Sequence, residues 1–300
     1  MTRTNITNAL TVDVEDYFHV SAFADTIDRA AWDHHKPRVE RNTYKLLDIF
    51  DEQNCKATFF VLGWVAERYP RLVRDIAVRN HEIACHGFSH QLIYDQTPEV
   101  FRTETARAKG LLEDTVQSPV YGYRGASFSV TRQSAWALDI LVELGFSYDS
   151  SIFPTRHDRY GLPGVSPFPH RLTTPGNQSL VEFPLSTIRV LGYRLPVAGG
   201  GYFRLYPYGF TRAALGHINS RHKRPFVFYL HPWEIDPDQP RIQAGWTSRF
   251  RHYNNLHKCE RRVNRLLDEF RFATVKDILG DLGLLAAAES KAAAPRESSR

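Results

Sequence analysis

Short apolar segments alternate with helical stretches along most of the chain, and this alternation constrains the fold more than any other feature. The apolar segments cover residues 9–14, 57–62, 82–85, 119–123, 146–148, 181–183, 226–230 and 271–275. Most of the stretches between them have the apolar periodicity of amphipathic helices. Buried strands that alternate with helices are typical of a parallel sheet covered by helices. Seven or eight such units favour a closed (β/α) barrel over an open α/β sheet.

The alternation continues to the last apolar helix, so we expect a single domain over residues 1–285. Within it, residues 151–180 are rich in Pro, Gly, His and Arg and lack periodicity, which predicts a long functional loop. Residues 232–285 form a C-terminal extension after the most apolar segment. Residues 286–300 are rich in Ala and then polar, a composition that predicts a disordered tail.

The chain is basic, with a formal charge of +5 and a pI of about 9.1. Its basic residues are dispersed and form no arm, so we do not expect a nucleic-acid partner. The densest basic stretch, residues 249–265, also carries apolar residues at near-helical spacing. It predicts an amphipathic surface helix. The alternative is a face that attracts an anionic polymer or a membrane surface.

Membrane-spanning and disulfide-rich proteins are excluded as classes. No run approaches the roughly 18 consecutive apolar residues of a membrane span, and the N-terminus has no apolar signal segment. The cysteines Cys55, Cys85 and Cys259 are odd in number and far apart, which excludes a disulfide framework and a Cys-x-x-Cys metal site. We therefore expect a cytoplasmic protein without a transmembrane segment, with peripheral membrane association through the basic stretch as an alternative.

Polar side chains that are costly to bury lie at the ends of several of the apolar segments or just past them. They are Asp13, Glu15, Asp16, His86, His90, Arg124, Asp149 and His231. The carboxyl ends of the strands of an α/β barrel meet at one mouth, where the loops build the functional site. Five strand ends with such residues therefore indicate one shared site more strongly than any single residue does.

The segment His86-Gly-Phe-Ser-His90 places two imidazoles four residues apart, so that both can reach one ion. Such a pair alone is more often an ordinary surface feature. Glu15 or Asp16 would add a carboxylate and complete a set of two histidines and one carboxylate with open positions. Zinc is the default ion for this set, and iron, cobalt and nickel are alternatives.

The other residues at the strand ends can supply proton transfer. Asp13 fits a general base or a metal ligand, and its alternative role is to cap a loop amide. Arg124 fits a fixed cation that orients that carboxylate, or an ordinary ion pair. His231 fits a general acid for a leaving amine, with Asp149 holding its tautomer, or a core histidine bonded to a backbone carbonyl.

In this order, the residues resemble the five motifs of the polysaccharide deacetylases of the NodB-homology class (carbohydrate esterase family 4). The matching segments are Thr-Val-Asp13-Val-Glu15-Asp16, His86-Gly-Phe-Ser-His90, Tyr-Arg124-Gly-Ala-Ser127, Tyr-Asp149-Ser-Ser and Phe-Tyr-Leu-His231. The resemblance covers roughly residues 8–275. The Asp-Val-Glu-Asp-Tyr-Phe-His, Gly-Gly-Gly-Tyr-Phe-Arg and Leu-His-Pro-Trp-Glu runs are similar to the subgroup associated with exosortase-linked exopolysaccharide clusters.

The resemblance implies a distorted (β/α) barrel of about seven strands, one divalent metal ion, and hydrolysis of an N-acetyl group with release of acetate. It also implies a role for each residue at the strand ends. By position, Asp13 is the base, Arg124 pairs with Asp13, His86 and His90 are metal ligands, His231 is the acid and Asp149 supports it.

Two departures from the family pattern leave residues unassigned. The usual adjacent Asp pair is replaced by Asp-x-Glu-Asp, and relatives with Asp-x-Asp favour Glu15 slightly over Asp16 as the ligand. Arg-Gly-Ala-Ser replaces Arg-x-Pro-Tyr, so the family's tyrosine wall is missing, although the resemblance still implies an oxyanion-binding N–H near Ser127. The hypothesis for the wall is that an aromatic residue elsewhere stacks on the sugar. The residues considered are Tyr202, Phe203, Trp233 and Tyr17.

The expected function is metal-dependent removal of acetyl groups from N-acetylhexosamine units of an exopolysaccharide or its lipid-linked precursor. The partner is then an N-acetylated glycan, and a cytoplasmic location favours the precursor. One alternative in the same fold is a small-amide hydrolase of the allantoinase-like type. The other is a catalytically inactive glycan-binding component of a biosynthetic complex. The sequence does not indicate an oligomeric state.

Overall fold

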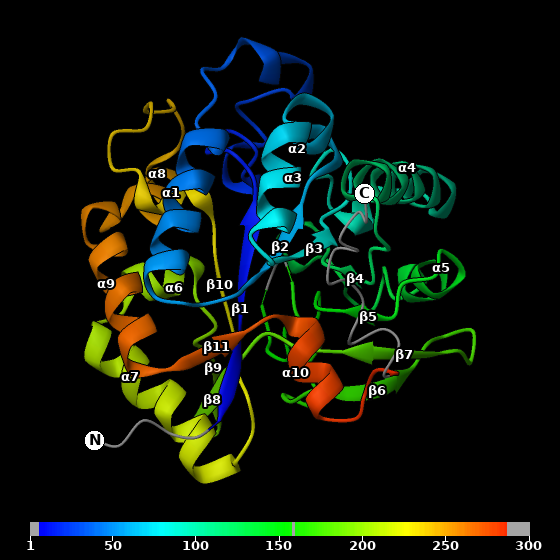
Figure 1. The fold of residues 1–300 in the computed structure, drawn as a ribbon, viewed down its shortest axis with the longest axis vertical. Coiled ribbons are helices and arrows are strands. Elements are labelled where there is room, and N and C mark those ends of the chain that lie inside the picture. The colour runs from blue at the N-terminus through cyan, green and yellow to red at the C-terminus, as the bar shows by residue number, and fades with distance from the viewer. Residues whose placement is uncertain (1–5, 158–159, 287–300) are drawn as a thin grey trace, which may run out of the picture.

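The protein is an α/β barrel with helices packed around its outside, as the computed structural model of residues 6–157 and 160–286 shows (Figure 1). The main sheet has the order β10-β1-β2-β3-β4-β5-β7-β6, and β11 pairs with β1. Its strands are β1 Thr7–Val14, β2 Thr58–Val61, β3 Glu82–Cys85, β4 Gly122–Tyr123, β5 Tyr148–Asp149, β6 His170–Thr173, β7 Ser179–Glu182, β10 Val227–Leu230 and β11 Arg271–Ala273. A separate hairpin consists of β8 Thr187–Val190 and β9 Tyr193–Pro196.

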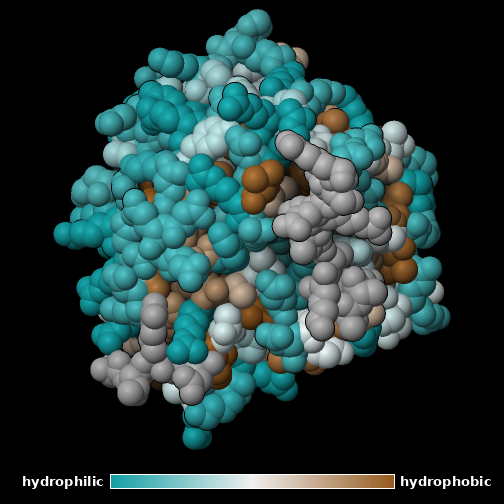
Figure 2. Space-filling view, in the orientation of Figure 1, coloured by the Kyte–Doolittle hydropathy of each residue, from teal (hydrophilic) through white to brown (hydrophobic). Residues whose placement is uncertain are grey.

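The helices follow the strands and cover the outside of the sheet. They are α1 Val39–Glu52, α2 Gly63–Arg68, α3 Pro70–Val78, α4 Pro98–Val116, α5 Ala137–Glu143, α6 Gly200–Leu205, α7 Tyr208–His217, α8 Trp246–Tyr253, α9 Leu256–Glu269 and α10 Val275–Asp281. On the side shown in Figure 2 the surface is mainly hydrophilic with small apolar patches, as expected for amphipathic helices with their apolar faces turned inward.

The strands of the main sheet are parallel except β6, which pairs antiparallel with β7. The chain after β7 closes the sheet against β10. The N–H of Val227 donates to Ser186 Oγ at 2.9 Å, and the N–H of Tyr229 donates to the carbonyl of Ala198 at 2.7 Å. Gly199 then bridges Tyr229 with a φ of +127°. A Cβ at Gly199 would lie 2.0 Å from the Tyr229 carbonyl oxygen, so this closure requires glycine.

Alternating residues of each strand point into the barrel and out toward the helices. In β1, Ala9 belongs to the interior apolar cluster, and Leu10 and Val12 belong to the cluster under the helices. The same alternation places Ala84 of β3 inside the barrel and Cys85 outside. Residues that continue the inward rows past the strand ends therefore face the mouth of the barrel.

The predicted α/β barrel of the NodB type is confirmed. The prediction of a loop over residues 151–180 is wrong in part. Residues 170–173 of the loop expected over 151–180 form the edge strand β6, which pairs in register with β7. The alternation of apolar and polar residues in β6 is weak because the strand lies at the edge of the sheet, where its side chains are half-buried or exposed. The tail predicted over 286–300 lies outside the described residues except for residue 286.

The single domain predicted over 1–285 stays a prediction. Within residues 6–157 and 160–286, no helix is long and apolar enough to cross a membrane.

Candidate metal centre and active site

Asp13 and Arg124 form a buried ion pair at the mouth of the barrel. Asp13 is 2% exposed and Arg124 is 0% exposed. Nη1 of Arg124 lies 2.7 Å from Asp13 Oδ1 and 2.8 Å from Thr11 Oγ1, on the same inward row of β1. The guanidinium packs over the Phe60 ring at 4.0 Å and donates to the Ser150 carbonyl. A cation held from several sides fixes the position of the Asp13 carboxylate.

Glu15, His86 and His90 come together beside Asp13, and each offers a ligand atom within 4.8 Å of the others. All three side chains are buried. His90 Nε2 lies 2.8 Å from Glu15 Oε2. Nδ1 of His86 donates to the Arg124 carbonyl at 2.8 Å, which leaves its Nε2 available as a ligand.

This donor set fits a divalent cation. Two imidazoles and a carboxylate with open positions suit zinc and similar ions. The buried Nδ1 of His90 has no hydrogen-bond partner among the residues that the structure describes, which is costly for a purely structural histidine. Burial lowers the pKa of His86 to about 4, so its ring is neutral at pH 7, as a ligand requires.

Charge also favours a cation at this place. Burial acts to raise the pKa of Glu15, but the neighbouring His90, His231 and His86 outweigh burial and hold that pKa well below its usual range. Glu15 is therefore an anion at neutral pH. Its Oε1 accepts a hydrogen bond from Trp233 Nε1 at 3.2 Å, which orients the carboxylate toward the histidines.

Asp16 points away from this cluster. Its Oδ2 accepts hydrogen bonds from the N–H groups of Arg38, at 2.6 Å, and Val39, at 2.8 Å, at the start of α1. Its Oδ1 accepts from the N–H of Tyr17 at 2.9 Å. Of the two carboxylates left open by the sequence, the structure therefore brings Glu15, and not Asp16, to the histidines.

His231 lies at the end of β10 on the other side of Asp13. Its Nε2 is 3.9 Å from Asp13 Oδ2 and 3.5 Å from Glu15 Oε1. Its Nδ1 is 3.0 Å from Glu234 Oε2, and Glu234 also binds the buried Arg204 at 2.6 Å. Burial acts to lower the pKa of His231, but the carboxylates of Glu15, Glu234 and Asp13 raise it to about 9.

The sequence-based assignment of Asp149 as the partner of His231 is wrong, because Glu234 occupies that place. Tyr148 points into the barrel, so the next residue of β5 faces the opposite side. There Asp149 accepts hydrogen bonds from the hydroxyl and N–H of Ser151 and pairs with its register neighbour Glu182, whose pKa burial raises. The neighbouring Ser150, and not Asp149, contacts Arg124 at the mouth.

Two residues predicted to contact the sugar are buried. Trp233 is 4% exposed and stacks between His231 and His252, at ring distances of 5.0 Å and 4.1 Å. Phe203 is 2% exposed and packs edge-to-face against Phe228. Neither ring can stack on a substrate. Trp233 instead positions Glu15 and His231.

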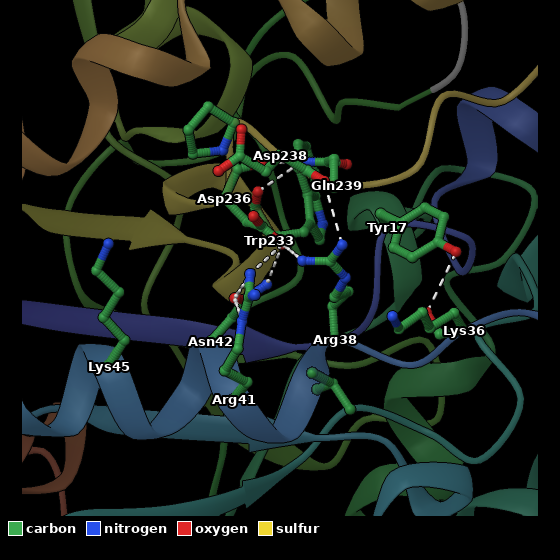
Figure 3. Close-up of polar contacts among 12 residues, drawn as sticks. Tyr17, Lys36, Arg38, Arg41, Asn42, Lys45, Trp233, Asp236, Asp238 and Gln239 are labelled. Atoms are coloured by element: carbon green, nitrogen blue, oxygen red, sulfur yellow. Dashed lines mark hydrogen bonds and ion pairs between the residues drawn. The ribbon is translucent and has the colours of Figure 1, made fainter.

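Tyr17 is buried too, and its hydroxyl donates to the Lys36 carbonyl at 3.3 Å (Figure 3). The same view shows the contacts that hold the segment after His231. Asp236, 3% exposed, binds Arg38 at 3.3 Å, Arg41 at 2.8 Å and Asn42 at 3.2 Å, all from α1 or its start. These contacts fix the segment that carries Trp233 against the first helix.

A cavity of about 610 Å³ opens above these residues, within the size range of small-molecule sites. Asp13, Glu15, His86, His90 and His231 line its floor. The predicted residues Ser127 and Tyr202 line its wall. The Ser127 hydroxyl bonds Ser21 at 2.7 Å, and the Tyr202 hydroxyl bonds Tyr160 at 2.7 Å.

The contact between His231 and Glu234 gives a pH prediction. His231 is competent as an acid only while protonated, so activity falls as the pH rises through its pKa. Glu234→Gln removes a carboxylate that raises this pKa. We expect the alkaline limb of kcat/KM to move to lower pH by about one unit or more. Asp149→Asn is the control, and its alkaline limb should stay in place. A limb that moves in Asp149→Asn but not in Glu234→Gln would restore the original assignment.

Two family models match adjacent parts of the chain. Residues 24–148 match the polysaccharide deacetylase family, and residues 150–280 match a domain of unknown function, DUF3473. The clustered residues His86 and His90 lie in the first segment. His231, Glu234 and Trp233 lie in the second, so both matched segments contribute to the site.

Curated relatives are similar over parts of the chain. A peptidoglycan-N-acetylglucosamine deacetylase of Bacillus cereus is 36% identical over 70 residues, which are 23% of this chain and 26% of that protein. A chitooligosaccharide deacetylase of Rhizobium leguminosarum bv. trifolii is 27% identical over 150 residues, 49% of this chain and 60% of that protein. The chain thus spans less than two thirds of the length of these two relatives.

Solved structures show a similar fold over nearly the whole chain. One from Mycobacterium smegmatis, described as a polysaccharide deacetylase, superimposes with a TM-score of 0.60 at 20% identity and covers 94% of this chain and 93% of that one. The Puue allantoinase superimposes with a TM-score of 0.60 at 13% identity and covers 93% of this chain and 92% of that one. At these identities the likeness concerns the fold.

Proposed function

We propose, from the premise that this chain belongs through residues 24–148 to the polysaccharide deacetylases, that it removes acetyl groups from an N-acetylated glycan with the help of a divalent metal ion. The reaction consumes water, breaks the amide C–N bond and yields a free amine and acetate. The observation that carries the proposal is the grouping of Glu15, His86 and His90 within 4.8 Å, beside Asp13 and His231 on the floor of one cavity.

When bound by Glu15, His86 and His90, the divalent ion supplies Lewis-acid activation of water and of the acetyl carbonyl. The chain's own residues move the protons. Asp13, which is not one of the three clustered ligands, takes a proton from the attacking water, and Arg124 holds its carboxylate in place.

His231 then gives a proton to the departing amine nitrogen. Glu234 holds the His231 ring through Nδ1 and keeps it protonated at neutral pH, so that Nε2 carries the proton toward the cavity. The base and the acid line the same cavity, with His231 Nε2 3.9 Å from Asp13 Oδ2, so a single acetamido group can reach both.

The cavity supports a glycan rather than a small cyclic amide. Two adjacent hollows of about 430 Å³ each share lining residues with it, one through Asp25 and Asp95 and the other through Tyr94 and Tyr160. Space that continues beyond the reacting group suits a chain of sugar units. An exopolysaccharide or its precursor as the substrate, and the cytoplasmic location predicted from the sequence, stay proposals.

Acetate release from three kinds of substrate tests this function. We expect release from N-acetylglucosamine oligomers, loss of that release after dialysis against a chelator, and its return with zinc. Ring opening of allantoin is expected to be undetectable.

Each alternative function predicts a different set of assay results. Turnover of allantoin without acetate release would assign the chain to the small-amide hydrolases. Oligomer binding that persists in His86→Ala, with no turnover of any N-acetylated glycan by the wild type, would assign it to inactive glycan-binding proteins. Activity unaffected by chelation would contradict the metal dependence.

A further inference from the structure

Helix α8 exposes two aromatic rings that the core does not need. Trp246 is 77% exposed and Phe250 is 45% exposed. They are four residues apart on one face of the helix, and their rings stack nearly parallel, with centroids 5.4 Å apart at an angle of 15°. The two rings form a small contiguous apolar patch, and contiguous exposed apolar patches are more often interaction sites than single exposed apolar residues are.

The pair is continuous with the cavity of the candidate active site. Phe250 lines that cavity, together with Arg251 and Asn254 from the end of the same helix. Leu205, at the end of α6, also lines it and is 49% exposed. The α8 helix lies toward the end of the barrel to which β1 and β10 point (Figure 1). A ligand that leaves the cavity on this side meets the Phe250 ring first and Trp246 one helical turn farther on.

The chemistry of this rim matches a sugar chain. The apolar face of a pyranose ring packs on an aromatic ring, as other flat apolar groups do. Arg251 and Asn254 offer hydrogen-bond donors to hydroxyl groups at the same rim. Arg251 is exposed and lines the cavity, so its guanidinium can reach a ligand at this rim.

We propose that Trp246 and Phe250 form a stacking platform for sugar units next to the one that is deacetylated, so that the preferred substrate is an oligomer or polymer. This inference rests on the proposed function. It assigns a role to the segment matched by the domain of unknown function, which supplies α8. It also replaces Phe203 and Trp233, the buried rings that sequence analysis considered for sugar stacking.

The test measures how the rate depends on substrate length. Acetate release is followed with β-1,4-linked N-acetylglucosamine dimers and hexamers, and the ratio of their kcat/KM values is compared between variants. We expect the wild type to prefer the hexamer. Trp246→Ala and Phe250→Ala should lower the ratio about tenfold, the equivalent of one lost aromatic contact. A ratio that stays at the wild-type value in both variants would overturn the platform.

Tyr193→Ala is the matched control. Tyr193 is 76% exposed on β9 and does not line the cavity. Since β9 leads from the hairpin turn toward Gly199, which bridges β10, the turn lies toward the opposite end of the barrel. The length ratio of Tyr193→Ala should equal that of the wild type. A fall as large as that in Trp246→Ala would assign the effect to general loss of surface aromatics and overturn the platform.

A binding measurement separates failure of this inference from failure of the proposed function. Trp246 is far more exposed than Trp32, Trp64 and Trp233, so its fluorescence should respond to added hexamer. A response that disappears in Trp246→Ala supports the platform even where no acetate is released. Binding to vesicles of anionic phospholipid is measured in parallel. Vesicle binding that is lost in Trp246→Ala, with an unchanged length ratio, would assign α8 to a membrane surface instead.

Discussion

Replacement of Asp13 by asparagine is expected to slow acetate release by about 10²- to 10⁴-fold while the protein keeps its metal ion. The amide of asparagine can still accept the hydrogen bond that Arg124 donates to Oδ1 at 2.7 Å, but it cannot take a proton from water. The clustered donors Glu15, His86 and His90 are unchanged. Metal content per protein and kcat, measured on the same preparation, check both parts of the prediction.

Thr11→Val is the matched control for this variant. Thr11 Oγ1 also accepts a hydrogen bond from Arg124 Nη1, at 2.8 Å, but it offers no base. We expect a loss of about 1 kcal/mol in the free energy of unfolding and a rate near that of the wild type. Loss of the metal ion from Asp13→Asn would make Asp13 a ligand. A rate near the wild-type value in Asp13→Asn would remove it from the reaction.

The neighbouring carboxylates Glu15 and Asp16 should respond in opposite ways. Glu15→Gln removes the anionic donor next to His86 and His90, so metal affinity and acetate release are each expected to fall at least about 100-fold. Asp16→Asn should keep the metal ion. Its amide group cannot accept all three backbone hydrogen bonds that Asp16 accepts, so the free energy of unfolding should fall by about 1–3 kcal/mol.

Zinc titration of the metal-free variants and thermal unfolding separate the two effects. Gln239 offers a comparison in the segment that follows His231. Its amide donates to the Trp233 carbonyl at 2.8 Å without touching the ligands, so Gln239→Ala should lower stability more than metal affinity. Loss of zinc binding in Asp16→Asn, with retention in Glu15→Gln, would reverse the assignment.

The barrel and the location of its site were predictable because they depend on strand periodicity. Apolar segments marked the strands. Asp13 lies on the inward row near the end of β1, and His86 and His231 continue the inward rows of β3 and β10. Side chains that continue inward rows meet at the mouth of a parallel barrel whatever the details of the loops. The short strands β4 and β5 have only two residues each. The alternation of apolar and polar residues therefore could not show which of the two points into the barrel.

The shortness of β5 explains the error at Asp149. The residues that point inward are its neighbours Tyr148 and Ser150, and the sequence did not show this. Glu234 was overlooked for a different reason. Its contact to His231 depends on the 3₁₀ helix Pro232–Ile235, which brings the side chain back to the strand end. The sequence does contain a signal for it, since a carboxylate three residues after His231, behind Pro232, fits a capping arrangement.

The exposure of Trp233 and of Trp246 depends on tertiary packing. Both are tryptophans in the same C-terminal extension, but one is 4% exposed and the other 77% exposed. The difference comes from His252 and Arg204, which cover Trp233 from distant parts of the chain. The sequence around either tryptophan does not indicate whether distant residues will pack over its ring.

We propose that hydrolysis of an N-acetyl group requires one divalent ion, held by Glu15, His86 and His90. Titration of the metal-free protein with zinc, with acetate release from an N-acetylglucosamine oligomer followed at each point, tests it most directly. We expect a linear rise that ends at one equivalent of zinc, and no rise in His86→Ala. Acetate release that is already maximal without metal, or that rises equally in His86→Ala, would contradict it.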